Sequence, residues 1–231
     1  TINDYYDVPI DALCPTKARR NFFVLHAVPQ RTVVLAAAGV LTFLILSFAQ
    51  YGLTGLGVLS VCLAVMFGYS APPLRLKSRP GWDVITHGLF METWPYLVCL
   101  ILIKSRWTSL DTLMTSVAFL SSVAAQLDQQ LRDYRLDFRA DYNFTVRYGV
   151  QVSTRLMVSA TVFGCLIFVL GTVFGIVPKF FLPYFLIVLP TVIYRLTHQI
   201  NGNARSDRLV RLSFISALLY TCILLGYLTL R

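Results

Sequence analysis

The chain has 231 residues, of which 56% are hydrophobic and 13% are charged. Soluble domains carry about 25% charged residues, so the apolar excess here must face lipid. The net charge of +9 does not indicate nucleic-acid binding, because the basic residues lie in short clusters between long apolar runs, as in the cytoplasmic loops of membrane proteins. The five cysteines show no metal-ligand spacing and are interpreted as small apolar side chains.

Seven apolar stretches are long enough to cross a bilayer, whose hydrocarbon core of about 30 Å requires roughly 20 helical residues. They predict an all-α fold, a polytopic bundle of transmembrane helices that forms a single domain over residues 1–231. In chain order the predicted spans are 32–50, 52–70, 83–103, 110–128, 152–176, 180–196 and 209–230.

The distribution of lysine and arginine predicts the orientation of these spans. With seven spans, sixteen basic residues fall on one side and four on the other, so the richer side is assigned to the cytoplasm. The sixteen are Lys17, Arg19, Arg20, Arg31, Arg75, Lys77, Arg79, Arg132, Arg135, Arg139, Arg147, Arg155, Arg195, Arg205, Arg208 and Arg211. The four are Lys104, Arg106, Lys179 and Arg231.

A first acidic group, consisting of Asn3, Asp4, Asp7 and Asp11, precedes the first span on the cytoplasmic side. On a helix, Asn3 and Asp7 share a face. Pro9 is predicted to break that helix just beyond Asp7, so that Asp11 reaches in from the following turn.

A second acidic group, consisting of Asp128, Asp133, Asp137 and Asp141, follows the fourth span on the same side. The last three are spaced at i, i+4 and i+8, which stacks three carboxylates on one stripe of a helix. Such like-charged pairs destabilise a helix by about 0.2–0.5 kcal/mol each, so a cation is expected nearby. Mg²⁺ suits oxygen ligands and is often shared with substrate phosphates. The alternative is a solvated loop in which Arg132, Arg135 and Arg139 neutralise the aspartates.

Between the two acidic groups lies a basic loop, defined here as residues 69–79, with the sequence Tyr-Ser-Ala-Pro-Pro-Leu-Arg-Leu-Lys-Ser-Arg. Its two prolines are predicted to hold the chain in an extended path, so that Arg75 and Lys77 point the same way, toward a diphosphate. The alternative is a loop whose charges serve only to orient the protein in the membrane.

These three segments together resemble the UbiA-type prenyltransferase superfamily. Asn3-Asp4-x-x-Asp7-x-x-x-Asp11 looks like its first aspartate motif, and the basic loop is similar to its Tyr-Ser-x-Pro-Pro-x-Arg-x-Lys segment. The run from Arg132 to Asp137, followed by Thr145 and Gly149, resembles the second motif and the helix after it.

The resemblance implies a nine-helix fold in which the first motif ends the second helix. The seven spans would then be the remainder of that fold, and two helices are expected to precede Thr1. It also implies an integral membrane enzyme with a cytoplasm-facing site that transfers an isoprenoid from a polyprenyl diphosphate to a lipophilic acceptor.

The resemblance implies a role for each matched residue. Tyr69, Arg75 and Lys77 would contact the diphosphate, and Asp7, Asp133, Arg75 and Lys77 would carry the catalysis. The implied Mg²⁺ ligands are Asn3, Asp4, Asp7, Asp11, Asp133 and Asp137.

The acceptor is less well defined by the motifs. After the first motif the chain reads Pro15-Thr-Lys-Ala-Arg-Arg-Asn, where quinone-forming members carry Arg-Pro-Leu-x-x-Gly. This looks closer to members that prenylate nonaromatic lipids, such as lycopene elongases. His87 and Glu92, inside the third span, are candidate acceptor-side bases or members of an interhelical hydrogen-bonded pair. A terpene cyclase and a noncatalytic membrane subunit or transporter of the same fold remain alternatives.

The orientation is testable by labelling single cysteines with reagents that cannot cross the membrane. Probes at 78 and 203 should label only from the cytoplasmic side, and a probe at 105 only from outside. The reverse pattern would refute the assigned orientation.

Overall fold

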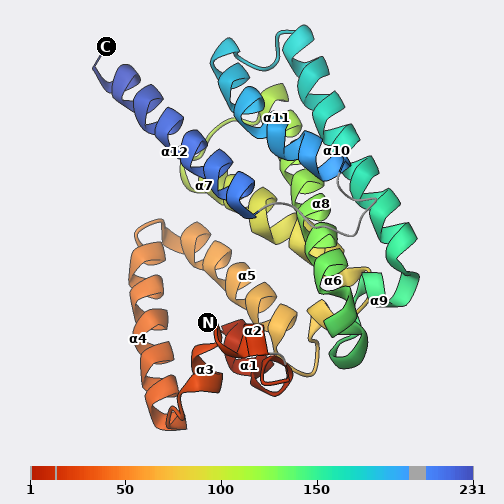
Figure 1. Cartoon of the computed structure of the whole chain (residues 1–231). Coiled ribbons are helices and arrows are strands. Elements are labelled where there is room, and N and C mark those ends of the chain that lie inside the picture. Colours follow the sequence, from red (N-terminus) through yellow and green to blue (C-terminus); the bar gives the residue numbers. More distant parts are fainter. Residues whose placement is uncertain (1, 14, 198–206, 231) are drawn as a thin grey trace.

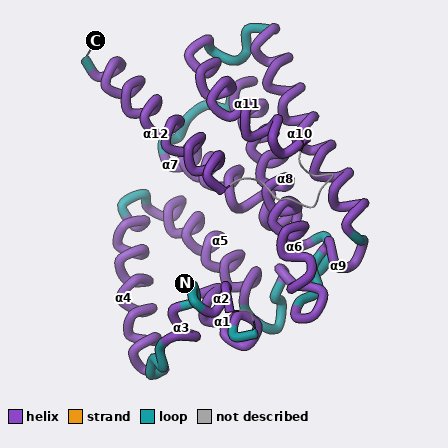
Figure 2. The backbone as a smooth tube through the Cα atoms, in the orientation of Figure 1, coloured by secondary structure: helices purple, strands orange, loops and turns teal. Residues whose placement is uncertain are grey.

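The computed structural model describes residues 2–13, 15–197 and 207–230. Over these ranges the chain forms helices joined by loops, with no strand (Figures 1 and 2). Seven of the described helical segments are long and apolar enough to cross a membrane, which confirms the predicted all-α, seven-span architecture. Position 203 and Arg205 lie outside the described residues.

The N-terminal part consists of short helices beside a helical hairpin. The short helices are α1 (Ile2–Asp11), α2 (Pro15–Ala18) and α3 (Phe22–Leu25). The hairpin pairs α4 (Gln30–Ala49) with α5 (Gly52–Ser70), and α1 packs against α5 (Figure 1). These contacts hold the first acidic group beside the basic loop, which begins in the last turn of α5.

The third span is one helical segment made of α6 (Trp82–Gly88), the π-helical turn η2 (Leu89–Thr93) and α7 (Trp94–Leu102). The other helices are α8 (Ser109–Ala140), α9 (Phe144–Tyr148), α10 (Val150–Val173), α11 (Leu182–Thr197) and α12 (Asp207–Thr229). Short 3₁₀ turns, η1 (Leu76–Ser78) and η3 (Lys179–Phe181), lie in two of the connections.

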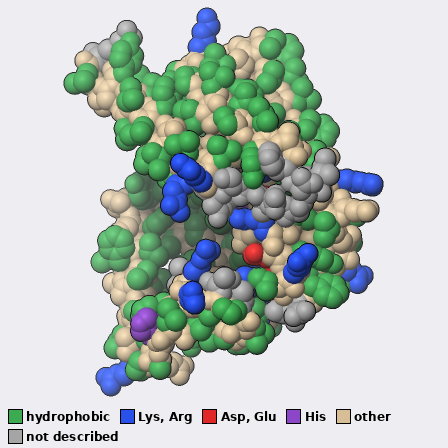
Figure 3. Space-filling model, viewed as in Figure 1, with side chains coloured by type: hydrophobic (Ala, Val, Ile, Leu, Met, Phe, Trp, Pro, Cys, Tyr) green, Lys and Arg blue, Asp and Glu red, His purple; other side chains and the backbone are tan. Residues whose placement is uncertain are grey.

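The centre of the bundle is α8, which packs against α6, η2 and α10. The buried core that joins these helices consists of Val84, Val123, Ala124, Leu127, Met157 and Ala160. By contrast, α4 has no buried residue. An unburied apolar helix is unfavourable in water, so the exposed faces of such helices are where lipid would lie. Figure 3 shows apolar side chains over most of the visible surface.

The length of α8 carries its end beyond the bilayer core. It has 32 residues, which at 1.5 Å per residue is about 48 Å of helix, whereas the hydrocarbon core is about 30 Å thick. A capping box between Thr108 and Asp111 closes its first turn. Its last turns, which carry Asp133 and Asp137, therefore extend to the membrane boundary.

Gly88 marks the closest approach of α6 to α8. A Cβ atom on Gly88 would lie 2.7 Å from Cγ2 of Val123 and 2.8 Å from Cε2 of Phe119. Gly88→Ala should therefore lower the melting temperature in detergent, because overpacking costs about 1–3 kcal/mol and exceeds the gain of roughly 1 kcal/mol in helix propensity.

Gly39→Ala on α4 is the matched control, since nothing lies within 4 Å of its added Cβ. Its melting temperature should equal that of the wild type or rise slightly. Equal melting temperatures for Gly88→Ala and the wild type would show that the two helices do not need this glycine.

Candidate active site

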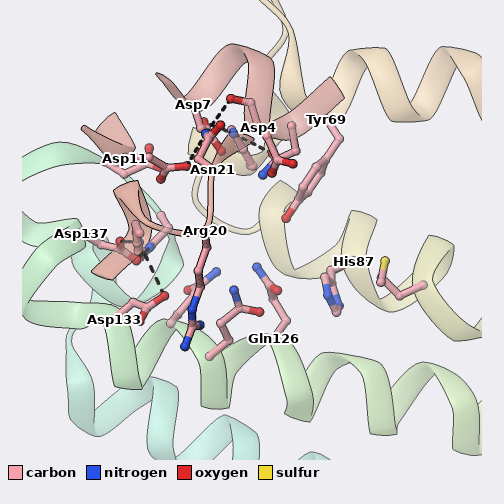
Figure 4. A pocket seen from close by; sticks show the side chains of 18 residues that line it. Asp4, Asp7, Asp11, Arg20, Asn21, Tyr69, His87, Gln126, Asp133 and Asp137 are labelled. Carbon is pink, nitrogen blue, oxygen red and sulfur yellow. Dashed lines mark hydrogen bonds and ion pairs between the residues drawn. The ribbon is translucent and has the colours of Figure 1, made fainter. Parts of the chain in front are cut away.

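One cavity of about 520 Å³ lies where the short N-terminal helices face α5, α6 and α8 (Figure 4). Its lining is rich in polar and charged side chains and includes Tyr69 and Lys77. The structure also brings all six residues of the expected metal-ligand set to this cavity: Asn3, Asp4, Asp7, Asp11, Asp133 and Asp137.

The first acidic group lies on one continuous helix, and the expected break at Pro9 is wrong. Helix α1 runs from Ile2 to Asp11 with Pro9 inside it. Pro9 removes one hydrogen bond and its ring crowds the carbonyl four residues earlier, yet the helix continues to Asp11. Asp7 and Asp11 are consequently stacked at i and i+4 on the face that lines the cavity.

Two cations of the basic loop meet Asp7. Arg75 donates from Nη2 to Oδ1 of Asp7 at 3.3 Å. Lys77 Nζ donates to the same oxygen and to Oδ1 of Asn3, the latter at 2.8 Å. The side chains of Lys77 and Asp7 are only 10% and 14% exposed, so this ion pair is shielded from bulk water. Lys77 lines the cavity, whereas Arg75 does not line it and contacts the lining residue Asp7.

The basic loop folds as a turn, so the predicted extended path is wrong. The amide of Arg75 donates to the carbonyl of Ala71 at 2.9 Å, and η1 follows at once. Arg75 itself adopts a left-handed conformation, with φ of 38°. This turn points Arg75 and Lys77 toward Asp7, while Arg79 instead donates to the carbonyl of Pro73.

The second acidic group forms a shorter stripe than expected. Helix α8 ends at Ala140, and Asp141 is its extended C-cap, with φ of −141°. Asp141 accepts from Ser78 Oγ at 2.6 Å and from the amide of Tyr142 at 2.8 Å. Aspartate side chains that bind nearby backbone groups favour helix ends. Asp141 thus lines the cavity from the loop, and only Asp133 and Asp137 are stacked on the helix.

Lys17, from α2, lies against the second acidic group. Its Nζ is 3.4 Å from Oδ1 of Asp137 and 3.6 Å from Oδ2 of Asp133. Burial alone would lower the pKa of Lys17, but the attraction of Asp137 and Asp133 outweighs it and raises that pKa. A cation from a distant segment, α2, therefore pairs with both Asp133 and Asp137.

Two neighbours of Lys17 complete this side of the cavity. Asn21 donates to Oδ2 of Asp11 and to the carbonyl of Asp4, both at 2.8 Å, and its own oxygen caps α3. Arg20 extends into the cavity between Asp133 and Gln126 (Figure 4). The sequence marked Lys17 and Arg20 only as cytoplasmic charges; their position directly after the first motif was the available signal.

A buried hydrogen-bond network behind the cavity joins α6, α8 and α9. Asp83, fully buried, accepts from Nε2 of Gln130 at 2.6 Å and from the amide of Phe144 at 2.7 Å. Gln130 in turn accepts from the hydroxyl and amide of Thr145 at 3.0 and 3.1 Å. Asn143 donates to Asp137 at 2.8 Å. Sequence analysis did not identify this network, although Thr145 belongs to the matched motif.

Away from Asp133 and Asp137, the cavity is lined by Tyr69, His87 and Gln126 (Figure 4). His87 hydrogen-bonds Ser122 of α8 through Nδ1 at 3.1 Å. His87 and Glu92 do not pair with each other in the described contacts: Glu92 hydrogen-bonds Ser121 and lies outside the cavity lining.

Not every acidic residue that the sequence offered reaches the cavity. Asp128 is buried on α8 and does not line it.

The oxygen-rich donor set fits a hard divalent cation such as Mg²⁺. Among the described residues, no three His, Cys, Asp or Glu side chains converge closely enough to hold a metal by themselves. A metal here would need further oxygen ligands, from water or an anionic substrate, which is how Mg²⁺ is commonly bound. Figure 3 shows an acidic side chain at the surface, with Lys and Arg side chains nearby.

Two solved structures share this fold. Both are of a UbiA homologue from Archaeoglobus fulgidus, one bound to GPP and Mg²⁺ and the other to DMAPP and Mg²⁺. Their TM-scores are 0.67 and 0.69 at 20% and 22% identity, and each match covers 95% of this chain and 79% of the other.

Comparison with known sequences gives two further matches. A lycopene elongase/hydratase from Haloarcula japonica is 34% identical over 92 residues, which are 39% of this chain and 30% of that protein's length. The match thus spans less than a third of that relative. The model of the UbiA prenyltransferase family matches residues 1–228. The chain therefore belongs to the UbiA prenyltransferase family.

Proposed function

We propose that this protein catalyses the Mg²⁺-dependent transfer of an isoprenoid group from a polyprenyl diphosphate to a hydrophobic acceptor in the membrane. The observation that carries the proposal is the meeting of two acidic groups in one cavity, each with a lysine ammonium on its carboxylates. This alternation of anions and cations suits a ligand that combines a divalent metal with a diphosphate.

The carboxylates of both groups would hold the metal. Asp4, Asp7 and Asp11 would act from α1, and Asp133 and Asp137 from α8, with Asn3 as an additional oxygen ligand. Bound Mg²⁺ supplies charge stabilisation to the departing diphosphate. That assignment follows from oxygen chemistry and from the shared cavity.

The cations have a second task in this proposal. Lys77 and Lys17 compensate the carboxylates before a metal binds. With the carboxylates holding Mg²⁺, both ammoniums would be available to the diphosphate oxygens, and Arg20 would add a guanidinium from the cavity wall. Preorganised positive charge at the leaving group lowers the barrier to breaking the bond between carbon and oxygen.

The acceptor is proposed to be a nonaromatic lipid. The partial match to a lycopene elongase/hydratase supports this choice, as does the sequence Pro15-Thr-Lys-Ala-Arg-Arg-Asn after the first motif. A terpene cyclase would also use the diphosphate end, but it would consume the donor with no acceptor present. A transporter would return its diphosphate ligand unchanged.

The experiment is to incubate the purified full chain in liposomes with Mg²⁺, a labelled prenyl diphosphate and candidate lipids, followed by mass spectrometry of the lipid extract. Prenylated lipid that appears with Mg²⁺ and disappears with EDTA supports transfer. Donor consumption without an acceptor favours the cyclase, and an unchanged donor contradicts both enzymes.

The aspartates are tested one group at a time. Asp7→Ala and Asp133→Ala should each lower turnover by about a hundredfold or more, which is roughly 2.7 kcal/mol of transition-state stabilisation. Asp111→Asn, on the opposite side of the membrane in the capping box of α8, is the control and should keep wild-type turnover. Near-normal turnover in both alanine variants would contradict the two-group site.

The basic loop is tested by a change that keeps its charge. Arg75 does not line the cavity but holds Asp7 there through its guanidinium, and Arg75→Lys removes that planar fork. Loss of a charge-assisted hydrogen bond costs about 1.5–3 kcal/mol, so kcat/KM for the donor should fall about ten- to a hundredfold, with a much smaller effect on the acceptor. Arg79→Lys, whose guanidinium contacts only the Pro73 carbonyl in the described loop, should match the wild type. Wild-type kinetics for Arg75→Lys would leave that residue a purely topological role.

A further inference from the structure

A pair of hydrogen bonds determines which nitrogen of His87 carries its proton. Ser122 Oγ, buried on α8, donates to the main-chain carbonyl of His87 at 3.0 Å. The same oxygen lies 3.1 Å from Nδ1 of the His87 ring. A hydroxyl has a single hydrogen, so Ser122 Oγ can only accept at Nδ1. Nδ1 therefore bears the hydrogen, and the neutral imidazole presents an unprotonated Nε2.

The unprotonated nitrogen is open to the cavity. His87 lines it together with Met91 and Gln126. Nε2 makes no hydrogen bond with a described residue. It is also absent from the set of buried polar atoms without a partner, so it is accessible from the cavity. Figure 4 shows His87 near Tyr69 and away from Asp133 and Asp137. A basic nitrogen thus lies apart from Asp133 and Asp137.

The backbone next to His87 is also unusual. The π-helical turn η2 begins at Leu89. Hydroxyls of Ser122 and Thr93 donate to the carbonyls of His87 and Gly88, both at 3.0 Å, just before it. Single π-helical turns inside α-helices occur frequently at functional sites. The side-chain hydrogen bonds therefore hold both the helix and the imidazole in place.

We propose that Nε2 of His87 is the general base that removes a proton from the prenylated acceptor. The proposal rests on the proposed function and deepens it. The bond between C1 and oxygen of the donor breaks, and its electron pair leaves with the diphosphate. A π pair of the acceptor forms the new bond to C1. The proton next to the resulting cationic carbon moves to Nε2, and its C–H electron pair closes a double bond.

Other groups of the cavity suit this step less well. Asp7, Asp133 and Asp137 are already paired with lysine ammonium groups. Glu92 and Asp83, the acidic residues of this span, do not line the cavity. The phenol of Tyr69 is a proton donor at neutral pH and not a base. His87 is therefore the base on the acceptor side.

The test replaces His87 by a residue that retains the Ser122 contact. In His87→Asn, the side-chain amide can still donate to Ser122 Oγ, but Nε2 is gone. The full chain in liposomes is given Mg²⁺, dimethylallyl diphosphate and lycopene as the acceptor probe. General-base catalysis contributes about 10²–10⁴-fold, so the alkene product should form at least about a hundredfold more slowly. Cation that is not deprotonated takes up water, so the ratio of alcohol to alkene should rise.

Donor binding is measured separately, as the thermal shift produced by a thiolodiphosphate analogue of the donor. It should be unchanged in His87→Asn. Glu92→Gln is the matched control and should keep the wild-type rate and product ratio. Ser122→Ala keeps the imidazole but not the hydrogen bond that orients it, and should lower alkene formation several-fold with normal donor binding.

The outcomes separate the two proposals. If the wild type forms no prenylated product, the proposed function fails and this inference fails with it. If the wild type is active and His87→Asn matches its rate and product ratio, only the base assignment is overturned. If His87→Asn loses donor binding, the Ser122→Ala variant decides. Alkene formation at the wild-type rate in Ser122→Ala overturns the assignment. A several-fold slower alkene formation with intact donor binding supports it.

Discussion

The repulsion between carboxylates gathered at the membrane boundary is the constraint on which the rest of this structure depends. Helix α1 stacks Asp7 and Asp11 on one face, and α8 stacks Asp133 and Asp137 on another, and both faces line one cavity. In a partly buried site such charges are stable only when they are paired. Lys77 supplies the cation on one side and Lys17 on the other. Each lysine comes from a different segment than the carboxylates it pairs with. Charge compensation therefore joins the basic loop to α1, and it also joins α2 to α8.

The scaffold behind the cavity is held by buried polar contacts that are well satisfied. Asp83 and Gln130 bind one another, and each also accepts main-chain hydrogens from the start of α9. Buried polar groups that find their partners specify a single arrangement, whereas an unpaired one is costly. This network fixes where the chain turns after α8. The turn brings Asn143 to Asp137 and Asp141 to Ser78 of the basic loop. The long α8 thus delivers carboxylates past the bilayer core, and the network keeps the loop after it at the cavity.

The cavity has two chemically different sides, and prenyl transfer requires both. Breaking the donor bond needs concentrated positive charge near the diphosphate, which the lysines, Arg20 and a bound metal would provide. Removing the proton from the prenylated acceptor needs a base that is not already paired with those cations. His87 lies apart from Asp133 and Asp137. Its hydrogen bonds with Ser122 leave the unprotonated Nε2 facing the cavity. This separation keeps the imidazole away from the metal ligands. A neutral imidazole is also a poorer ligand for Mg²⁺ than a carboxylate, so it does not compete for the metal.

The sequence by itself determined the number of membrane spans, the all-α fold and the residues of the two acidic groups, because hydropathy, helix length and i, i+4 spacing are local properties of the chain. Local rules were wrong where tertiary contacts compete with them. Helix α1 continues through Pro9, the basic loop turns instead of extending, and Asp141 leaves the α8 stripe to bind Ser78. Only the tertiary structure decided that Lys17 compensates Asp137, and that His87 faces the cavity while Glu92 does not. The physical reason is that ion pairing and cavity exposure depend on which distant segments meet, and spacing along one helix does not contain that information.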